Sequence, residues 1–175
     1  MTIKTIFLDR DGVINKEVSY LHKIEDFEFI DGVFKACHYL ISLDYKLIII
    51  TNQSGISRQY YNENDYQIIT NWMKSQFNKN GINLLDVFHC PHLPNSNCNC
   101  RKPKPGMLLQ AKNKYNIDMK NSWMIGDTET DIQAAISAGV KNTILVRSGH
   151  IIDKSTSSAS YFVDSVQELN QVIST

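Results

Sequence analysis

Short apolar runs alternate with amphipathic segments along the whole chain. The run at 46–50 (KLIII) is almost continuously apolar, which is typical of a strand buried on both faces. The segment at 31–43 instead places apolar residues three and four positions apart, which is typical of a helix with one buried face. The same reasoning predicts strands at 3–9, 46–50, 85–89, 122–126, 142–147 and 161–163, and helices at 31–43, 63–79, 106–116, 129–138 and 165–173.

Strands that alternate with helices predict an α/β fold with a doubly wound, mainly parallel sheet. We expect a single domain over residues 1–175, because no internal repeat and no change of composition divides the chain. Asp31 is expected to cap the start of the first helix, and Gly139 the end of the fourth. The polar, serine-rich segment at 148–160 is expected to be a mobile loop.

Polar side chains follow three of the predicted strands. Asp9 and Asp11 end the first strand, the segment 51–54 (TNQS) ends the second, and Asp127 ends the fourth, with Asp131 one helical turn further. Parallel sheets of this class bind ligands outside the carboxyl ends of their strands. The pattern therefore predicts one site where the three strand ends meet.

The pair Asp9 and Asp11 has two interpretations. Asp11-Gly12 is an ordinary turn signal, which needs no function. Alternation along an extended chain would otherwise put both carboxylates on one side and Arg10 on the other. Two neighbouring carboxylates resist double ionisation, and a divalent cation with oxygen ligands relieves that repulsion. Asp127 would supply a third oxygen.

Two further segments are weaker signals when each is taken alone. In TNQSGI, Thr51 or Ser54 could simply cap a helix, but beside the aspartates a hydroxyl and free N–H groups suit a phosphate. In GDTETD, Asp127 and Asp131 could simply favour a helix start, and their spacing of four could also place them on one helical face.

The segment CPHLPNSNCNC predicts a zinc site. It has the spacing C-x-H-x5-C-x-C, a set of thiolate and imidazole ligands that suits four-coordinate zinc. A disulfide or a catalytic cysteine is the alternative, and a full set of four ligands favours structural zinc in a loop at about 90–100. The proposed zinc ligands are Cys90, His92, Cys98 and Cys100. Cys37 is expected in the core, and four histidines are expected to be surface or core residues: His22, His38, His89 and His150.

Arg101 and Lys102 follow this loop directly. They could be a solvated basic pair, but a zinc-held loop before them would fix both cations in place, and phosphate is their natural target. Lys+Arg and Asp+Glu are both 18, and this balance argues against a dedicated nucleic-acid binder. No apolar run is long enough to span a membrane and no signal peptide is visible, so we expect a cytoplasmic protein.

The motifs FLDRDGVIN, ITNQSGI, Lys102 and IGDTETD occur in the order of the four motifs of the haloacid dehalogenase superfamily, and the resemblance covers nearly the whole chain. Within it, DFEFIDGV, the zinc-loop spacing, RKP and PGM resemble the heptose-bisphosphate phosphatase subfamily and its histidinol-phosphatase relatives. The x5 spacing is shorter than in some members, and Ser19 stands where glycine is frequent. The fold implied is Rossmann-like, and residues 12–30 leave no room for a cap domain.

The resemblance implies a magnesium-dependent phosphatase. Asp9 would attack phosphorus and form an aspartyl-phosphate, and Asp11 would transfer the proton. Magnesium would be held by Asp9, the backbone carbonyl of Asp11 and Asp127, with Asp131 in support, where it would orient the metal shell or Lys102. Thr51, Asn52 and Lys102 would stabilise the transferring phosphoryl group. The substrate-binding residues would be Arg10, Glu17, Val18, Ser19, Tyr20, Gln53, Ser54 and Arg101.

The substrate that the resemblance implies is D-glycero-D-manno-heptose 1,7-bisphosphate, which would lose its C7 phosphate on the way to nucleotide-activated heptose for lipopolysaccharide, capsule or glycoprotein. Histidinol phosphate is the nearest alternative substrate. A polynucleotide 3'-phosphatase and a non-catalytic zinc-containing binding module are further alternatives, which the neutral charge and the complete acidic set disfavour. We expect a small-molecule phosphosugar as the partner, with no nucleic acid and no membrane, and a monomeric protein.

Overall fold

The computed structural model of the chain describes residues 1–150 and 154–174. Six strands form one sheet in the order β3-β2-β1-β4-β5-β6, and every neighbouring pair is parallel. This confirms the predicted doubly wound parallel sheet. The strands are β1 (Thr5–Leu8), β2 (Lys46–Asn52), β3 (Asp86–Cys90), β4 (Trp123–Gly126), β5 (Asn142–Val146) and β6 (Tyr161–Val163).

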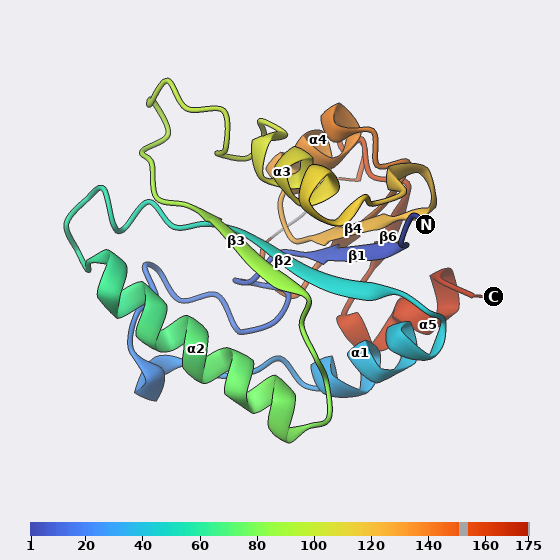
Figure 1. Ribbon diagram of the computed structural model, residues 1–175, viewed down its shortest axis with the longest axis horizontal. Coiled ribbons are helices and arrows are strands. Elements are labelled where there is room, and N and C mark those ends of the chain that lie inside the picture. The colour runs from blue at the N-terminus through green and yellow to red at the C-terminus, as the bar shows by residue number, and fades with distance from the viewer. Residues whose placement is uncertain (151–153, 175) are drawn as a thin grey trace.

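Helices cover both faces of the sheet (Figure 1). The helices are α1 (Val33–Ser42), α2 (Glu63–Lys79), α3 (Gly106–Tyr115), α4 (Glu129–Ala138) and α5 (Leu169–Val172). One core lies under α1, α2 and α5 and the other under α3 and α4. The alternation of β1 explains the two cores, because Ile6 and Leu8 point into the first and Phe7 into the second.

The ends of the helices show which of the predicted capping residues act as caps. α1 begins after Gly32, which has a φ of 80° and makes no side-chain cap, so the prediction that Asp31 caps this helix is wrong. Gly139 has a φ of 88° and ends α4, which confirms its predicted role, because glycine adopts the left-handed region without a Cβ penalty. The predicted last helix is divided into a 3₁₀ turn (Val166–Glu168) and α5.

β1 lies at the topological switch of the sheet. The chain adds β2 and β3 on one side of β1, and β4, β5 and β6 on the other. A crevice forms where successive connections leave a central strand in opposite directions, and ligands bind in such crevices. The carboxyl end of β1 is therefore the position from which a side chain reaches both halves of the site.

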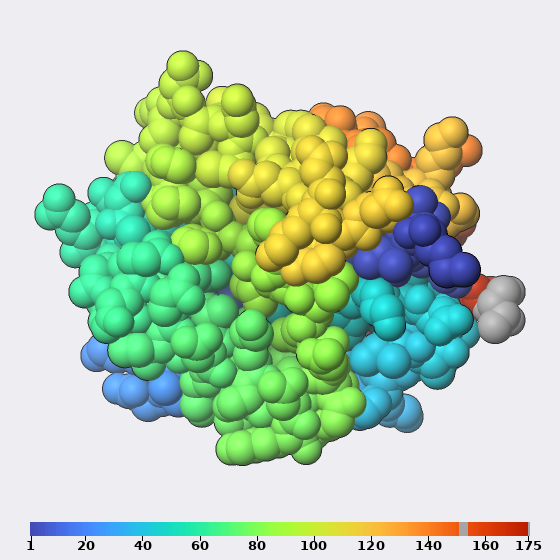
Figure 2. Space-filling model, viewed as in Figure 1, coloured from blue at the N-terminus to red at the C-terminus, as the bar shows by residue number. Residues whose placement is uncertain are grey.

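Two loops project at one end of the molecule. One follows β2 and the other joins β3 to α3, and they lie together in the ribbon and space-filling views (Figures 1 and 2). Backbone hydrogen bonds connect them, from the Gln53 amide to the Cys90 carbonyl at 2.7 Å and from the Ser57 amide to the Pro91 carbonyl at 3.3 Å. The second loop contains the predicted zinc ligands, so this contact joins the zinc loop to the end of β2.

The segment 148–160 is only partly described, because 151–153 lie outside the described residues and the prediction of a mobile loop falls partly on them. Beyond that gap, the Ser157 hydroxyl and the Ser158 amide donate hydrogen bonds to the carboxylate of Glu129 at the start of α4. Within residues 1–150 and 154–174, no helix is both long enough and apolar enough to span a bilayer.

Candidate active site and zinc-ligand cluster

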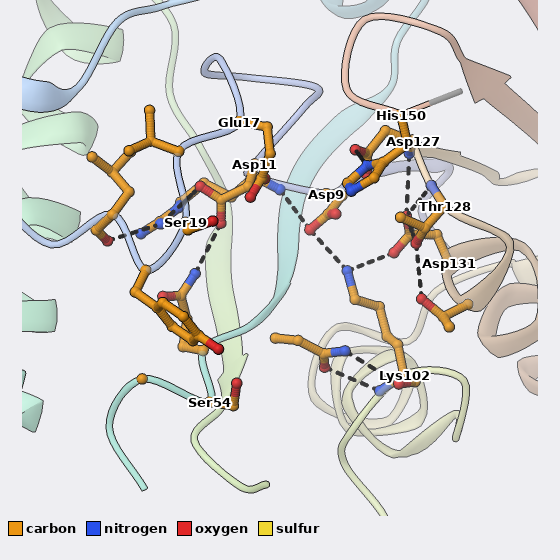
Figure 3. A pocket seen from close by; sticks show the side chains of 18 of the residues that line it. Asp9, Asp11, Glu17, Ser19, Ser54, Lys102, Asp127, Thr128, Asp131 and His150 are labelled. Carbon is orange, nitrogen blue, oxygen red and sulfur yellow. Dashed lines mark hydrogen bonds and ion pairs between the residues drawn. The ribbon is translucent and has the colours of Figure 1, made fainter. Parts of the chain in front are cut away.

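A pocket of about 360 Å³ opens beyond the carboxyl ends of β1, β2 and β4. All the residues predicted for catalysis, phosphate, substrate or magnesium line it, except Thr51, which is buried beneath its floor. Figure 3 shows Asp9 near the centre, with Asp11 and Glu17 on one side and Asp127, Asp131 and Lys102 on the other. The predicted convergence of three strand ends is therefore present in the structure.

Asp9 is the first residue after β1 and is 9% exposed. Its Oδ1 accepts hydrogen bonds from the Lys102 ammonium at 2.8 Å and from the Arg10 amide at 2.8 Å. Burial, and then the nearby Asp131 carboxylate, raise the pKa of Asp9 well above its ordinary value, although the Lys102 ammonium acts in the opposite direction. These two donors fix the direction of the carboxylate.

Lys102 is a buried cation at the centre of the site. Its Nζ lies 2.8 Å from Asp9 Oδ1 and 2.6 Å from Asp131 Oδ1, and it donates to the Ile50 carbonyl at 2.8 Å. Burial alone would lower the pKa of Lys102, but the Asp131 and Asp9 carboxylates outweigh it and raise that pKa. The ammonium therefore stays charged between the two carboxylates.

The Asp131 carboxylate contacts both the start of α4 and Lys102 in the pocket. Its Oδ2 accepts from the amides of Asp127 and Thr128 at 3.2 and 3.1 Å, which caps α4, while its Oδ1 faces Lys102. The helix-start interpretation of GDTETD is therefore confirmed for Asp131, whereas Asp127 precedes α4 and does not lie on a face of that helix. The capping bonds fix the carboxylate that holds Lys102, and the predicted alternative that Asp131 orients Lys102 fits this contact.

The site fits a divalent cation with oxygen ligands. Carboxylate oxygens of Asp9, Asp127 and Asp131 lie within 4.8 Å of one another, and all three residues are buried. Burial, and then repulsion by Asp131, raise the pKa of Asp127 to about 7. A Cβ on Gly12 or Gly149 would lie 2.1 or 1.9 Å from Asp127 Oδ2, so these glycines make room for this carboxylate. Magnesium prefers hard oxygen donors such as these. Its positive charge would offset the repulsion between the carboxylates.

Asp11 is held by donors on both oxygens. Its Oδ1 accepts from the guanidinium of Arg10 and the amide of Asn15, both at 2.9 Å, and its Oδ2 accepts from the Gln53 amide at 3.1 Å. The inference that Arg10 lies opposite the two carboxylates is wrong, because the side chain of Arg10 is 2% exposed and is ion-paired with Asp11. β1 ends at Leu8, so strand alternation does not extend to these residues. Substrate binding by Arg10 stays a prediction.

Asn52 contacts Lys102 through both ends of its amide. Its Oδ1 accepts from the Lys102 backbone amide at 3.1 Å, and its Nδ2 donates to the Lys102 carbonyl at 3.2 Å. The side chain thus joins the end of β2 to the segment that follows the zinc loop. Direct stabilisation of phosphate by Asn52 stays a prediction, and the structure adds this positioning contact to it.

Residues 17–20 form an exposed flap over one side of the pocket. Tyr20 has a φ of 57° and packs edge-on against Tyr60, with a centroid distance of 4.7 Å. The flap meets the loop after β2 through this contact. Glu17, Val18 and Ser19 line the pocket beside it, as the substrate-binding prediction requires, and their contact with substrate stays a prediction.

His150 lies at the site although no motif in the sequence predicts it there. Its Nδ1 lies 2.6 Å from Asp127 Oδ2, and it lines the pocket (Figure 3). The expectation that it is an ordinary surface or core residue is wrong. A single histidine in a serine-rich segment carries no spacing signal, and only the position of β5 beside β4 brings it near Asp127.

The four predicted zinc ligands converge. One donor atom from each of Cys90, His92, Cys98 and Cys100 lies within 4.8 Å of the others. His92 Nδ1 is 3.4 Å from Cys90 Sγ and 3.3 Å from Cys100 Sγ, and Cys90 Sγ is 3.9 Å from Cys98 Sγ. These separations fit donors around one tetrahedral zinc ion, whose bonds are about 2.0–2.3 Å long. The Cys100 and Cys90 sulfurs lie closer together, at 2.9 Å, and would have to separate to bind such an ion. His89 instead faces Glu63 and Tyr66.

The zinc-ligand cluster also touches the basic pair. Arg101 Nη1 donates to the His92 carbonyl at 3.2 Å, and the Gly106 amide donates to the Asn99 carbonyl at 2.9 Å. Cys37, in contrast, is 1% exposed in the core, as predicted, and burial raises the pKa of its thiol to about 12. The cluster and the two cations that are predicted to face phosphate therefore form one connected segment.

Known proteins resemble this chain over most of its length. A relative from Campylobacter jejuni, named D-glycero-alpha-D-manno-heptose-1,7-bisphosphate 7-phosphatase, is 51% identical and covers 83% of this chain and 84% of its own. A relative from Escherichia coli K12, named for the beta substrate, is 40% identical and covers 98% and 94%. The crystal structure of a B. bronchiseptica D,D-heptose 1,7-bisphosphate phosphatase, complexed with magnesium and phosphate, matches with a TM-score of 0.82 and 28% identity over 95% of this chain and 96% of that one.

A family model described as HAD-hydrolase-like matches residues 99–169, which contain Lys102, Asp127 and Asp131. The relatives cover most of the chain, and the solved structure has the same fold. The chain belongs to the heptose-1,7-bisphosphate 7-phosphatase family of the haloacid dehalogenase superfamily.

Proposed function

We propose that this chain hydrolyses D-glycero-D-manno-heptose 1,7-bisphosphate at C7, with magnesium, through an aspartyl-phosphate on Asp9. The observation that carries the proposal is the contact of Lys102 with both Asp9 and Asp131 beside Asp127, at the switch point of the sheet. This contact supports a site in which a nucleophile, a cation and a metal-binding set would surround one point. Relatives that are 40% and 51% identical and named for this reaction support the substrate.

Asp9 is suited to attack phosphorus. Lys102 and the Arg10 amide hold its Oδ1, so the side chain does not have to be ordered in the transition state. Asp9 and Asp127 would hold magnesium with the Asp11 carbonyl, and Asp131 would support them. The ion would offset the negative charge that otherwise repels a carboxylate from a phosphate. Lys102, with Thr51 and Asn52 beside it, would stabilise charge on the phosphoryl oxygens.

Asp11 is suited to transfer the proton. It would protonate the leaving sugar alkoxide and then remove a proton from the hydrolytic water. Its carboxylate lines the same pocket as Asp9, and donors from Arg10, Asn15 and Gln53 fix its orientation. The two carboxylates one residue apart would therefore have different tasks, because their contacts differ.

The cluster of Cys90, His92, Cys98 and Cys100 would hold structural zinc. Its four donors leave no open coordination position for a substrate. The contact of Arg101 with His92 indicates what such an ion would support, namely the position of the basic pair beside the pocket. Arg101 and the exposed flap at 17–20 would then recognise the rest of the phosphosugar.

The test is phosphate release by the purified protein from both anomers of the heptose bisphosphate and from histidinol phosphate. We expect the alpha anomer to be preferred, since the relative named for it is 51% identical and the one named for beta is 40% identical. EDTA should stop turnover and magnesium should restore it. Asp9→Asn, which is nearly isosteric, should be folded but inactive. Faster hydrolysis of histidinol phosphate than of either anomer would overturn the substrate proposal.

A further inference from the structure

A chain of hydrogen bonds runs from Tyr61 to Asp11 beneath the pocket. The Tyr61 hydroxyl donates to Gln53 Oε1 at 2.5 Å. Gln53 Nε2 in turn donates to Asp11 Oδ2 at 3.1 Å and to Thr51 Oγ1 at 2.9 Å. Tyr61 and Gln53 are 5% and 3% exposed, so water competes little for these bonds. Both hydrogens of the Gln53 NH₂ group are thereby directed at site residues.

The direction of the Gln53 amide matters because its two ends are chemically opposite. The NH₂ group donates and the carbonyl oxygen only accepts, and the Asp11 carboxylate in its ionised form also only accepts. A rotation of the amide by half a turn would place an oxygen against Asp11 Oδ2, and the two acceptors would repel each other. The contact with Asp11 therefore exists only in one of two amide orientations that have nearly the same shape.

Tyr61 selects that orientation. Burial raises the pKa of Tyr61 to about 12, so its hydroxyl keeps its proton and can donate to Gln53 Oε1. The ring itself is fixed, because it stacks on His22 with a centroid distance of 5.1 Å, and Gly55 leaves room for it, since a Cβ there would lie 2.1 Å from the Tyr61 ring. A fixed hydroxyl donor can pair with the carbonyl end of the amide and leaves the NH₂ end for Asp11.

We propose that Tyr61 is a positioning residue for Asp11: its hydroxyl fixes the Gln53 amide so that the NH₂ group holds the Asp11 carboxylate in place for proton transfer. The inference rests on the proposed phosphatase reaction. Tyr61 itself donates to Gln53 and acts on Asp11 only through it. The role should therefore show in the step that needs a proton.

The test compares Tyr61→Phe with the wild type on two phosphate esters. Heptose bisphosphate releases an alkoxide that must be protonated, whereas p-nitrophenyl phosphate releases a phenolate that leaves without a proton. The ratio kcat/KM reports the steps up to the departure of the first product. For the heptose bisphosphate we expect kcat/KM to fall about tenfold, an effect between that of losing one hydrogen bond and that of misplacing a catalytic group by about 1 Å. For the aryl ester we expect kcat/KM to fall less than about twofold.

Two further variants separate positioning from damage to the fold. Tyr60→Phe is the matched control, because Tyr60 is 57% exposed and the variant keeps its ring contact with Tyr20, so it should match the wild type. In a Gln53→Leu background the Tyr61→Phe change should cause no further loss, since Tyr61 acts through Gln53. Melting temperatures of all variants check that each is folded.

The outcomes are distinct. Equal kcat/KM for Tyr61→Phe and wild type on the sugar, an equal loss on both esters, or a further loss in the Gln53→Leu background would each overturn the inference. If the wild type hydrolyses neither ester, the proposed phosphatase function fails and this inference fails with it. If the wild type hydrolyses only other alkyl phosphates, the substrate proposal fails, and the same comparison with such an ester still decides the role of Tyr61.

Discussion

The ammonium of Lys102 lies 2.8 Å from Asp9 Oδ1, although 93 positions separate the two residues along the chain. Lys102 follows the zinc-ligand cluster and Asp9 follows β1, so this contact joins two elements that fold far apart in sequence. Asp131 completes the arrangement from the first turn of α4. The position of the Lys102 ammonium therefore depends on β1, on the zinc-ligand cluster and on the cap of α4.

Lys102→Met should remove most of the activity. The variant keeps a long side chain but leaves the buried carboxylates of Asp9 and Asp131 without their cation, and a lost electrostatic contact in the transition state is worth about 10²–10³-fold in kcat. Phosphate release and thermal melting measure the two effects, and the melting temperature should also fall. Lys112→Met, at an exposed position on α3, is the control and should match the wild type. Turnover within about tenfold of wild type would contradict a central role for Lys102.

Asn52→Asp should lower kcat by about 10-fold, as loss of a supporting contact does around other catalytic groups. The new carboxylate can still accept from the Lys102 amide but cannot donate to the Lys102 carbonyl, which lies 3.2 Å from the present Nδ2. Steady-state kinetics measure the effect, with Asn78→Asp at the exposed end of α2 as the control. Kinetics unchanged by Asn52→Asp would mean that the backbone contact does not set the position of Lys102.

Much of the fold was predictable because the capping residues and the spacing of the apolar residues indicate the same helices and strands. α2 and α4 span the predicted residues, and both begin with a capping box. In a capping box, the residue before the helix and the residue three positions later each bond the other's backbone amide through their side chains. The start of α1 was not predictable from Asp31, since the left-handed backbone of Gly32 begins the helix without any side-chain cap. The signal there lies in the backbone rather than in a capping side chain.

The site also has features that were predictable from the sequence and features that were not. The convergence of Asp9, Asn52 and Asp127 follows from parallel topology, because polar residues at strand ends meet at one edge. The pairing of Arg10 with Asp11 was missed because β1 ends before these residues, so alternation does not apply. His150 was missed because one isolated histidine has no spacing, and only the sheet order brings it to the pocket.

Cys100→Ala should lower the zinc content and the activity together. The purified wild type should hold close to one zinc per chain, because four donors converge on one point. Without the Cys100 thiolate, residues 90–104 lose their anchor, and activity should fall by about 10–100-fold as the Arg101 and Lys102 positions relax. Metal analysis and kinetics measure this, and circular dichroism should show the sheet intact. A zinc-free wild type, or unchanged kinetics in the variant, would contradict the role given to the cluster.

Thiol labelling should distinguish the core cysteine from the zinc ligands. Iodoacetamide reacts with the thiolate, and a pKa of about 12 leaves on the order of 10⁻⁵ of the Cys37 thiol ionised at neutral pH. Cys37 should therefore react only after unfolding, and so should Cys90, which is 0% exposed and whose pKa burial raises to about 12. Cys98 and Cys100 should instead react once a strong zinc chelator is added. Peptide mass spectrometry identifies the labelled residues. Labelling of Cys37 in the native protein, or of Cys98 or Cys100 without chelator, would contradict this assignment.

The most direct test of the account is to trap the phosphorylated enzyme. Heptose bisphosphate and magnesium are mixed rapidly with the wild type, the reaction is quenched in acid during the first turnover, and peptide mass spectrometry locates the phosphoryl group. We predict one phosphoryl group on the peptide that contains Asp9, located on Asp9 itself, and none in Asp9→Asn. Turnover by the wild type without any such adduct, or an active Asp9→Asn variant, would contradict the claim that Asp9 is the nucleophile.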